Sequence, residues 1–262
     1  MTVSRSREIG MARDESDLRD LDFMAGLPFG RPLRGAVATN FPDELADRSL
    51  FIRLLDEVPG PIGLAHAALL AWSGQRAPPS GQGQPVEGLC VGYAPGSAAV
   101  LPDKTTNFDL IRAREDEVVS DDDTWAWHKV ADIAGPSLWR LRALDVWYED
   151  NMIRATTQFQ DSASLPNSAS CRRVMHEYQV TAIIDPSDFF LRAVEVTTGV
   201  LPFATCFAAP ASAGRLVGSP VSTFGKLVSM DLAGTAGCTH LNEALKALQD
   251  VPAIARALRA SC

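Results

Sequence analysis

The sequence RVMHEYQVTAII, residues 173–184, decides the fold because apolar residues recur at every second position. Side chains of a β-strand point alternately to its two faces. One face of this stretch would carry Val174, His176, Tyr178, Val180, Ala182 and Ile184. The stretch is therefore predicted to be a strand whose apolar face lies on the core. His176 falls on that face, and a buried imidazole must find a hydrogen-bond partner, so His176 is a candidate site residue.

Three further β-rich runs extend this strand into a sheet. Residues 138–148 and 152–160 are separated by the polar turn 149–151, and residues 189–197 follow the turn 185–188. Turns of this length connect antiparallel strands in hairpins. The last third has helical spacing instead, at residues 209–216, 222–232, 239–248 and 252–260. Strands followed by helices predict an α+β fold, with an antiparallel β-sheet built from hairpins and helices packed on one of its faces.

The N-terminal part is predicted to be a helical extension of this core. Residues 41–58 and 61–72 have helical spacing, whereas residues 73–102 are rich in Gly, Pro, Ser and Gln and are typical of a long loop. We divide the chain into residues 1–110, a helical region with a Gly/Pro-rich loop, and residues 111–262, the α+β core. One continuous domain is the alternative.

Composition narrows the class of protein. The formal net charge is -8 and the isoelectric point is about 5.0, which argues against a nucleic-acid surface. The five cysteines include no CxxC pair, which favours a reducing compartment. Charged residues interrupt the first thirty positions, and no apolar run is long enough to span a bilayer. We expect a cytoplasmic protein without a nucleic-acid or membrane partner. The sequence does not decide between a monomer and a homodimer.

A second cluster of reactive residue types, Cys238, Thr239 and His240, stands at the start of a predicted helix. Thr239 is suited to cap that helix, because its hydroxyl can accept a hydrogen bond from a first-turn amide. The field at a helix N-terminus favours a thiolate and disfavours an imidazolium. The alternative is structural, with Cys238 as a small buried hydrophobe and His240 as a hydrogen-bonded residue of the first turn.

The residues favour cofactor-independent acid–base chemistry. The sequence has no GxGxxG, GxxxxGK[ST], HExxH or GxSxG motif, so no cofactor is expected. Histidines and carboxylates can exchange protons near pH 7, and a tyrosine can donate one. The candidate catalytic residues are His176, His128, Asp161, Tyr178, His240 and Glu177. Aromatic side chains suit an apolar substrate, and the candidates for binding it are Trp127, Phe159, Phe203 and Trp147.

Two alternatives accompany this interpretation. A zinc-dependent hydrolase or lyase would use Cys206, Cys238 and His240, because thiolate and imidazole ligands together suit zinc. A non-enzymatic protein that binds a small molecule would use the same apolar surroundings, and its histidines would be structural.

Four motifs in the second half resemble a known family. They are HEY at residues 176–178, LPFATC at 201–206, GRLVG at 214–218 and AGCTHLNEALKAL at 236–248. In this order they resemble the bacterial family known as domain of unknown function 2889, and the resemblance covers residues 125–248. It implies a bacterial cytoplasmic protein and a substrate of the aromatic, terpenoid or steroid kind, but no reaction. The function we predict is therefore that of a lyase, isomerase or hydratase acting on such a hydrophobic molecule.

Overall fold

The computed structural model describes residues 2–3, 9–11, 20–27, 31–57, 64, 69, 72, 87–97, 99–100, 113–114, 135–166 and 168–260. These residues fall into two compact units, Met1–His66 and Ala67–Cys262. The boundary predicted between residues 110 and 111 lies outside the described residues, as does most of the helix predicted over residues 61–72. Both stay predictions.

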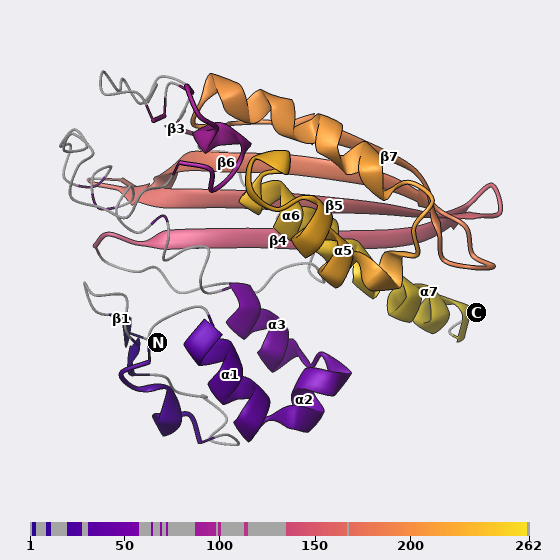
Figure 1. The fold of residues 1–262 in the computed structure, drawn as a ribbon, viewed down its shortest axis with the longest axis horizontal. Coiled ribbons are helices and arrows are strands. Elements are labelled where there is room, and N and C mark those ends of the chain that lie inside the picture. The colour runs from indigo at the N-terminus through magenta and orange to yellow at the C-terminus, as the bar shows by residue number, and fades with distance from the viewer. Residues whose placement is uncertain are drawn as a thin grey trace. The chain divides into compact units, whose positions relative to one another are not determined.

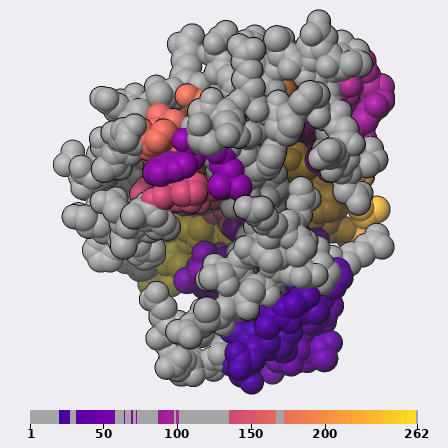
Figure 2. Space-filling model, turned by 90° about the vertical axis from the view of Figure 1, so that its left-hand side faces the viewer, coloured from indigo at the N-terminus to yellow at the C-terminus, as the bar shows by residue number. Residues whose placement is uncertain are grey.

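The first unit is mainly helical, as predicted. It contains α1 (Arg31–Asn40), α2 (Pro42–Asp47) and α3 (Leu50–Glu57), with the short strands β1 (Thr2–Val3) and β2 (Ile9–Met11) and the 3-10 turn η1 (Asp22–Met24). Its apolar centre is formed by Leu21, Met24, Leu33, Val37 and Ile52. The single helix predicted over residues 41–58 is wrong, because Arg48 adopts a left-handed φ of 51° and separates α2 from α3. The helices of this unit form the indigo-to-purple surface at the lower right of Figure 2.

The second unit is built on a long antiparallel sheet, which confirms the predicted α+β class. Its strands are β3 (Ala113–Arg114), β4 (Leu138–Glu149), β5 (Met152–Leu165), β6 (Ser168–Ile184) and β7 (Leu191–Thr198). They are ordered β3-β6-β5-β4, and β7 also pairs with β6. Asp150 and Asn151 supply the tight turn between β4 and β5, since both adopt a left-handed φ that Asp and Asn tolerate well.

Helical segments cover one face of this sheet (Figure 1). On that face of β5, Ile153, Ala155, Thr157 and Phe159 are fully buried, whereas the alternate residues are partly exposed up to Gln158. The helical segments of this unit are η2 (Val91–Tyr93), η3 (Ala204–Leu216), η4 (Val221–Thr223), α5 (Phe224–Asp231), η5 (Gly234–Ala236), α6 (Thr239–Ala247), η6 (Leu248–Asp250) and α7 (Val251–Ala260). Of these, η3, α6 and α7 contact strands of the sheet directly. None of the described helices has the length and apolarity that a membrane crossing requires.

Helix α6 brings the Cys238 cluster onto the sheet. Its residues Leu241, Ala244 and Leu245 are fully buried, so one apolar stripe fixes the helix against the core. The predicted cap is wrong, because Cys238 takes the extended N-cap conformation and Thr239 is the first helical residue. The Cys238 side chain makes no capping hydrogen bond. His240 therefore lies in the first turn, next to the sheet.

A β-bulge interrupts the pairing of β5 with β6. Asp161 pairs with His176, but the next residue of β5, Ser162, pairs with Val174, so Met175 is an extra residue. An extra residue shifts the alternation of side chains by one position. The predicted grouping of Val174 with His176 on one face is therefore wrong, and Arg173, paired with Ala163, takes the helix-covered face instead.

Candidate active site

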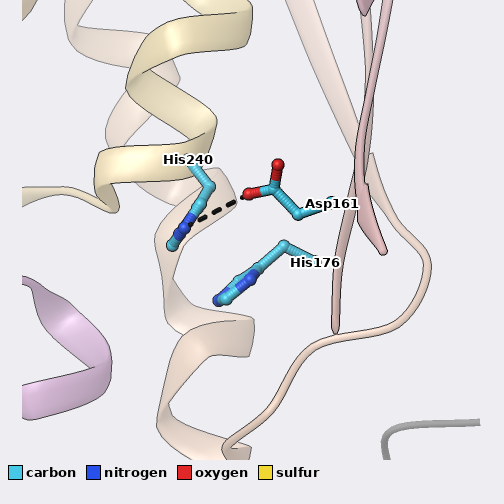
Figure 3. A group of neighbouring side chains, drawn as sticks. All are labelled: Asp161, His176 and His240. Atoms are coloured by element: carbon cyan, nitrogen blue, oxygen red, sulfur yellow. Dashed lines mark ion pairs between the residues drawn. The ribbon is translucent and has the colours of Figure 1, made fainter. Parts of the chain in front are cut away.

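A row of polar side chains crosses three strands at one end of the helix-covered face. Arg140 on β4 pairs with Asp161 on β5, and Asp161 pairs in turn with His176 on β6. Directly paired residues of antiparallel strands point to the same face, so the three side chains stand side by side. His240, from the first turn of α6, lies over this row (Figure 3).

The two imidazoles form a stacked pair beside a carboxylate. The ring centroids of His176 and His240 lie 3.5 Å apart, and the ring planes are inclined by only 17°. His240 Nε2 faces Asp161 Oδ2 at 3.5 Å, the contact drawn as a dashed line in Figure 3. Asp161, His176 and His240 form the one group of potential metal ligands, among the described residues, whose ligand atoms all lie within 4.8 Å of one another.

Arg140 holds Asp161 in a fixed orientation. Its Nε and Nη2 atoms donate hydrogen bonds of 2.8 Å to the two carboxylate oxygens. The side chains of Arg140 and Asp161 are 7% and 0% exposed, so this is a buried, bidentate ion pair. The guanidinium also lies 4.8 Å from the centroid of the Phe159 ring. Within the pair, the arginine charge compensates that of the carboxylate.

The site keeps both imidazoles neutral at physiological pH. Burial, and to a lesser extent the positive charge of Arg140, lowers the pKa of His240 to about 3. Burial also lowers the pKa of His176 well below its usual value; His240 and Arg140 act in the same direction, and Asp161 opposes them. A neutral imidazole has a free lone pair, so either ring has the protonation state of a general base.

The surroundings of His240 select its tautomer. A carboxylate only accepts hydrogen bonds, so the Asp161 oxygen 3.5 Å from Nε2 favours the tautomer with the proton on that nitrogen. Its other nitrogen, Nδ1, lies 3.9 Å from Cys238 Sγ and 3.4 Å from Thr239 Oγ1, and both groups can donate to it. The Tyr178 hydroxyl donates a 3.3 Å hydrogen bond to the same sulfur. Both nitrogens of His240 thus face groups of the protein.

His176 differs from its stacked neighbour. The residue is 6% exposed, and its buried Nδ1 atom has no hydrogen-bond partner within the described part of the chain. A buried polar atom without a partner costs roughly 1–3 kcal/mol. An atom of this kind calls for an explanation, and a catalytic role is one of those known. Of the two imidazoles, His176 is the one with an uncommitted nitrogen.

The stacked geometry is a poor fit for a metal ion held by both histidines. Ligand lone pairs lie in the ring planes, and metal–nitrogen bonds are about 2.0–2.1 Å long. Two nearly parallel rings at 3.5 Å do not direct their lone pairs to one point. Both oxygens of Asp161 are also engaged by Arg140. The alternative zinc ligands Cys206, Cys238 and His240 do not form such a close group among the described residues.

The other predicted site residues lie in different places. Tyr178 is buried two pairs along from His176, and burial raises its pKa, so it stays a phenol. Glu177 points to the opposite face of β6, where its Oε1 accepts a 3.1 Å hydrogen bond from Gln160. Cys206 is buried in the core. His128 and Trp127 lie outside the described residues.

The aromatic residues predicted to bind the substrate also lie in different parts of the structure. Phe159 is fully buried, with its ring centroid 6.0 Å from that of His240. Phe203 instead makes an edge contact with Tyr93, at 5.4 Å between ring centroids. Trp147 is 39% exposed and lies seven residues along β4 from Arg140, about 23 Å at 3.3 Å per residue. Phe159 is the only one of these three described aromatics placed beside the histidines.

Sequence reasoning missed Arg140 and Arg173. The signal for Arg140 was present, because Leu138, Arg140 and Arg142 alternate with Trp139 and Leu141, so one face of this strand carries charge within an apolar sheet. Arg173 had no such signal. Its face depends on the bulge at Met175, which a two-residue period does not reveal.

One comparison with known proteins gives a match, and the match lies in this part of the chain. Residues 139–253 match a family model described as Protein of unknown function (DUF2889). The resemblance predicted for the second half of the chain is confirmed. No curated protein and no solved structure matches the chain. The matched region contains Arg140, Asp161 and His176, which form the polar row, and His240, which lies over it.

Proposed function

We propose that this protein is an enzyme that performs acid–base chemistry on a small hydrophobic molecule without a cofactor, as a lyase, isomerase or hydratase. The observation that supports this most strongly is the buried stack of His176 on His240 beside the Arg140–Asp161 pair. Such a cluster of polar groups is costly inside an apolar core, and it holds two neutral bases in one orientation.

The contacts assign different roles to the four residues. His176 exchanges protons with the substrate, because its Nδ1 is the nitrogen without a protein partner. His240 supports the His176 ring by stacking, and Asp161 fixes the tautomer of His240. Arg140 holds Asp161 through two hydrogen bonds. His240, Asp161 and Arg140 are thus positioning residues, and His176 is the catalytic residue.

One proton transfer cycle accounts for each of the proposed reaction types. His176 accepts a proton from a substrate carbon next to a carbonyl, and the positive charge it gains is stabilised by the nearby Asp161 carboxylate. Return of that proton to another carbon completes an isomerisation. Return of the proton to a departing hydroxyl completes an elimination of water, and hydration is the reverse. In each case the imidazole ends neutral, and no oxidant or reductant is consumed.

A zinc-dependent hydrolase or lyase is the second candidate. It is favoured by the 3.9 Å separation of Cys238 Sγ and His240 Nδ1, since thiolate and imidazole are both zinc ligands. Metal analysis of the purified protein separates the two candidates. One tightly held zinc ion per chain favours the second, and full activity after treatment with a chelator favours the first.

Hydrogen exchange tests the main proposal without knowledge of the complete reaction. The protein is incubated in D₂O with aromatic, terpenoid and steroid ketones, and NMR follows deuterium incorporation next to the carbonyl. We expect at least one class to exchange faster with the wild-type protein than in buffer. His176→Asn should abolish the acceleration, and Gln179→Glu, an exposed position on the same strand, should retain it. Equal exchange by His176→Asn and the wild type would contradict the proposal.

A further inference from the structure

Arg173 lies close to the polar row along β6, and its guanidinium has no hydrogen-bond or ion-pair partner among the residues that the structure describes. Its Nε atom is buried and makes no hydrogen bond. The residues paired with Arg173 are Ala163 on β5 and Ala113 on β3, and alanine carries no group that could neutralise a charge. A buried part of a cation without compensation is costly, so a negatively charged group is the expected complement.

The bulge at Met175 is what turns Arg173 toward the site. Residues three apart on a regular strand point to opposite faces, so Arg173 and His176 would be separated by the sheet. The extra residue brings both to the face of Asp161 and Ala163. Bulges are over-represented next to active sites, where they redirect a side chain. Arg173 thus lies on the helix-covered face, two pairs along from His176.

The neighbouring arginines differ from Arg173 in their partners. Arg140 is neutralised by Asp161. Arg172, on the opposite face, donates to Ser162 and lies over the Trp139 ring, 4.1 Å from its centroid. The row to which Arg173 belongs otherwise contains Leu138 and Ala163, both apolar. The half-buried Arg173 thus has only apolar cross-strand neighbours, and it lies two pairs along β6 from His176.

We propose that Arg173 binds a carboxylate group of the substrate, so that the protein acts on hydrophobic carboxylic acids. The inference rests on the proposed function for the position of the reacting atoms. Arg173 would hold the carboxylate in a two-pronged ion pair, as guanidinium groups do. Leu138 and Ala163, the apolar residues in line with Arg173, would contact the hydrophobic part of the substrate. His176 would then face a carbon a few bonds from the carboxylate.

Binding of matched probe pairs tests this assignment. Calorimetry or NMR titration of the full chain compares benzoate with benzamide and 2-naphthoate with 2-naphthamide, because each pair differs in charge and hardly in shape. We expect the carboxylate to bind more tightly to the wild type. In Arg173→Gln that preference should fall by about tenfold to a hundredfold, the range for a charged hydrogen bond, and Arg173→Lys should retain part of it.

Three outcomes would overturn the assignment. They are a wild-type protein that binds no carboxylate probe, one that binds acid and amide equally, and a preference that survives in Arg173→Gln. Circular dichroism of each variant verifies the fold. The experiment uses no turnover, so it separates the two proposals: a lost preference with intact hydrogen exchange refutes only the role of Arg173. A carboxylate preference without any exchange refutes only the acid–base function.

Discussion

Arg140 and Asp161 are paired residues of two neighbouring strands, and their side chains form an ion pair with two hydrogen bonds of 2.8 Å inside the protein. This pair is the rigid base of the site, because Asp161 in turn faces His240. Buried ion pairs add little net stability when formed, but removal of one partner leaves a buried charge.

Arg140→Met is therefore expected to destabilise the protein by about 3–5 kcal/mol, because the buried Asp161 carboxylate would lose the arginine that compensates its charge. Urea denaturation measures the change in the free energy of unfolding. The control is the double variant Arg140→Met with Asp161→Leu, in which both charges are absent. We expect it to recover most of the loss. A double variant as unstable as the single one would mean that packing, and not the unpaired charge, dominates.

Stability is expected to fall as the pH drops below about 6.5. Burial lowers the pKa of His176 and His240 in the folded protein, so the unfolded chain binds protons that the folded protein does not. Below the unfolded pKa of about 6.5 the free energy of unfolding then decreases by at most about 1.4 kcal/mol per pH unit for each histidine. For His240 this window extends down to a pH of about 3.

Urea denaturation between pH 7.5 and pH 5 measures this slope, and His240→Gln supplies the control. Gln is not titratable, so the variant should lose the contribution of His240, while His66 and His128 are common to both proteins. An identical slope in the variant and the wild type would show that His240 does not remain neutral in the folded state.

The sequence was sufficient for the sheet and insufficient for the full site. Alternation along residues 176–184 identified β6 and placed His176 on the core face, because a regular strand has a fixed period of two. Cys238, Thr239 and His240 were also recognised as a cluster at a helix start. The meeting of His240 with Asp161 depends on how α6 packs on the sheet, a contact between distant segments that local patterns do not contain.

The bulge shows most directly why sequence patterns fail at this site. Nothing in the letters RRVMHEY indicates that Met175 is an extra residue, and a strict period of two puts Val174 beside His176 and Arg173 on the other face. The pairing of Ser162 with Val174 reverses that order. Glu177 shows the opposite case. It is next to His176 in the sequence, but neighbouring residues of a strand point to opposite faces, so the two side chains lie on opposite sides of the sheet.

The buried thiols are expected to react slowly with alkylating reagents. Burial raises the pKa of Cys206 to about 12 and also raises the pKa of Cys90, so the reactive thiolate is scarce near pH 7.5. Incubation with iodoacetamide, followed by mass-spectrometric mapping, gives the rate for each cysteine. In urea both cysteines should react at the rate of an exposed thiol. Rapid labelling of native Cys206 would show that the core around η3 opens easily.

Gly237→Ala is expected to disturb the position of His240. The Cβ of an alanine would lie 2.5 Å from the Leu232 carbonyl oxygen and 3.0 Å from Asn242 Oδ1, so the segment that leads into α6 must shift. The effect is steric, since the φ of −153° at Gly237 is open to any residue. Overpacking of this kind costs about 1–3 kcal/mol. Urea denaturation measures the cost, and NMR signals of the His176 and His240 rings report whether the stack is retained.

Gly214→Ala is the matched control for this prediction. A Cβ at Gly214 would meet nothing within 4 Å, and its backbone is not in the left-handed region, so stability should change by less than about 0.5 kcal/mol. Equal destabilisation by the two substitutions would mean that alanine is unfavourable for a reason other than the contact with Leu232. A destabilised Gly237→Ala with unchanged ring signals would show that the stack is held by α6 itself, because the apolar stripe of Leu241, Ala244 and Leu245 anchors the helix to the sheet independently of the segment before it.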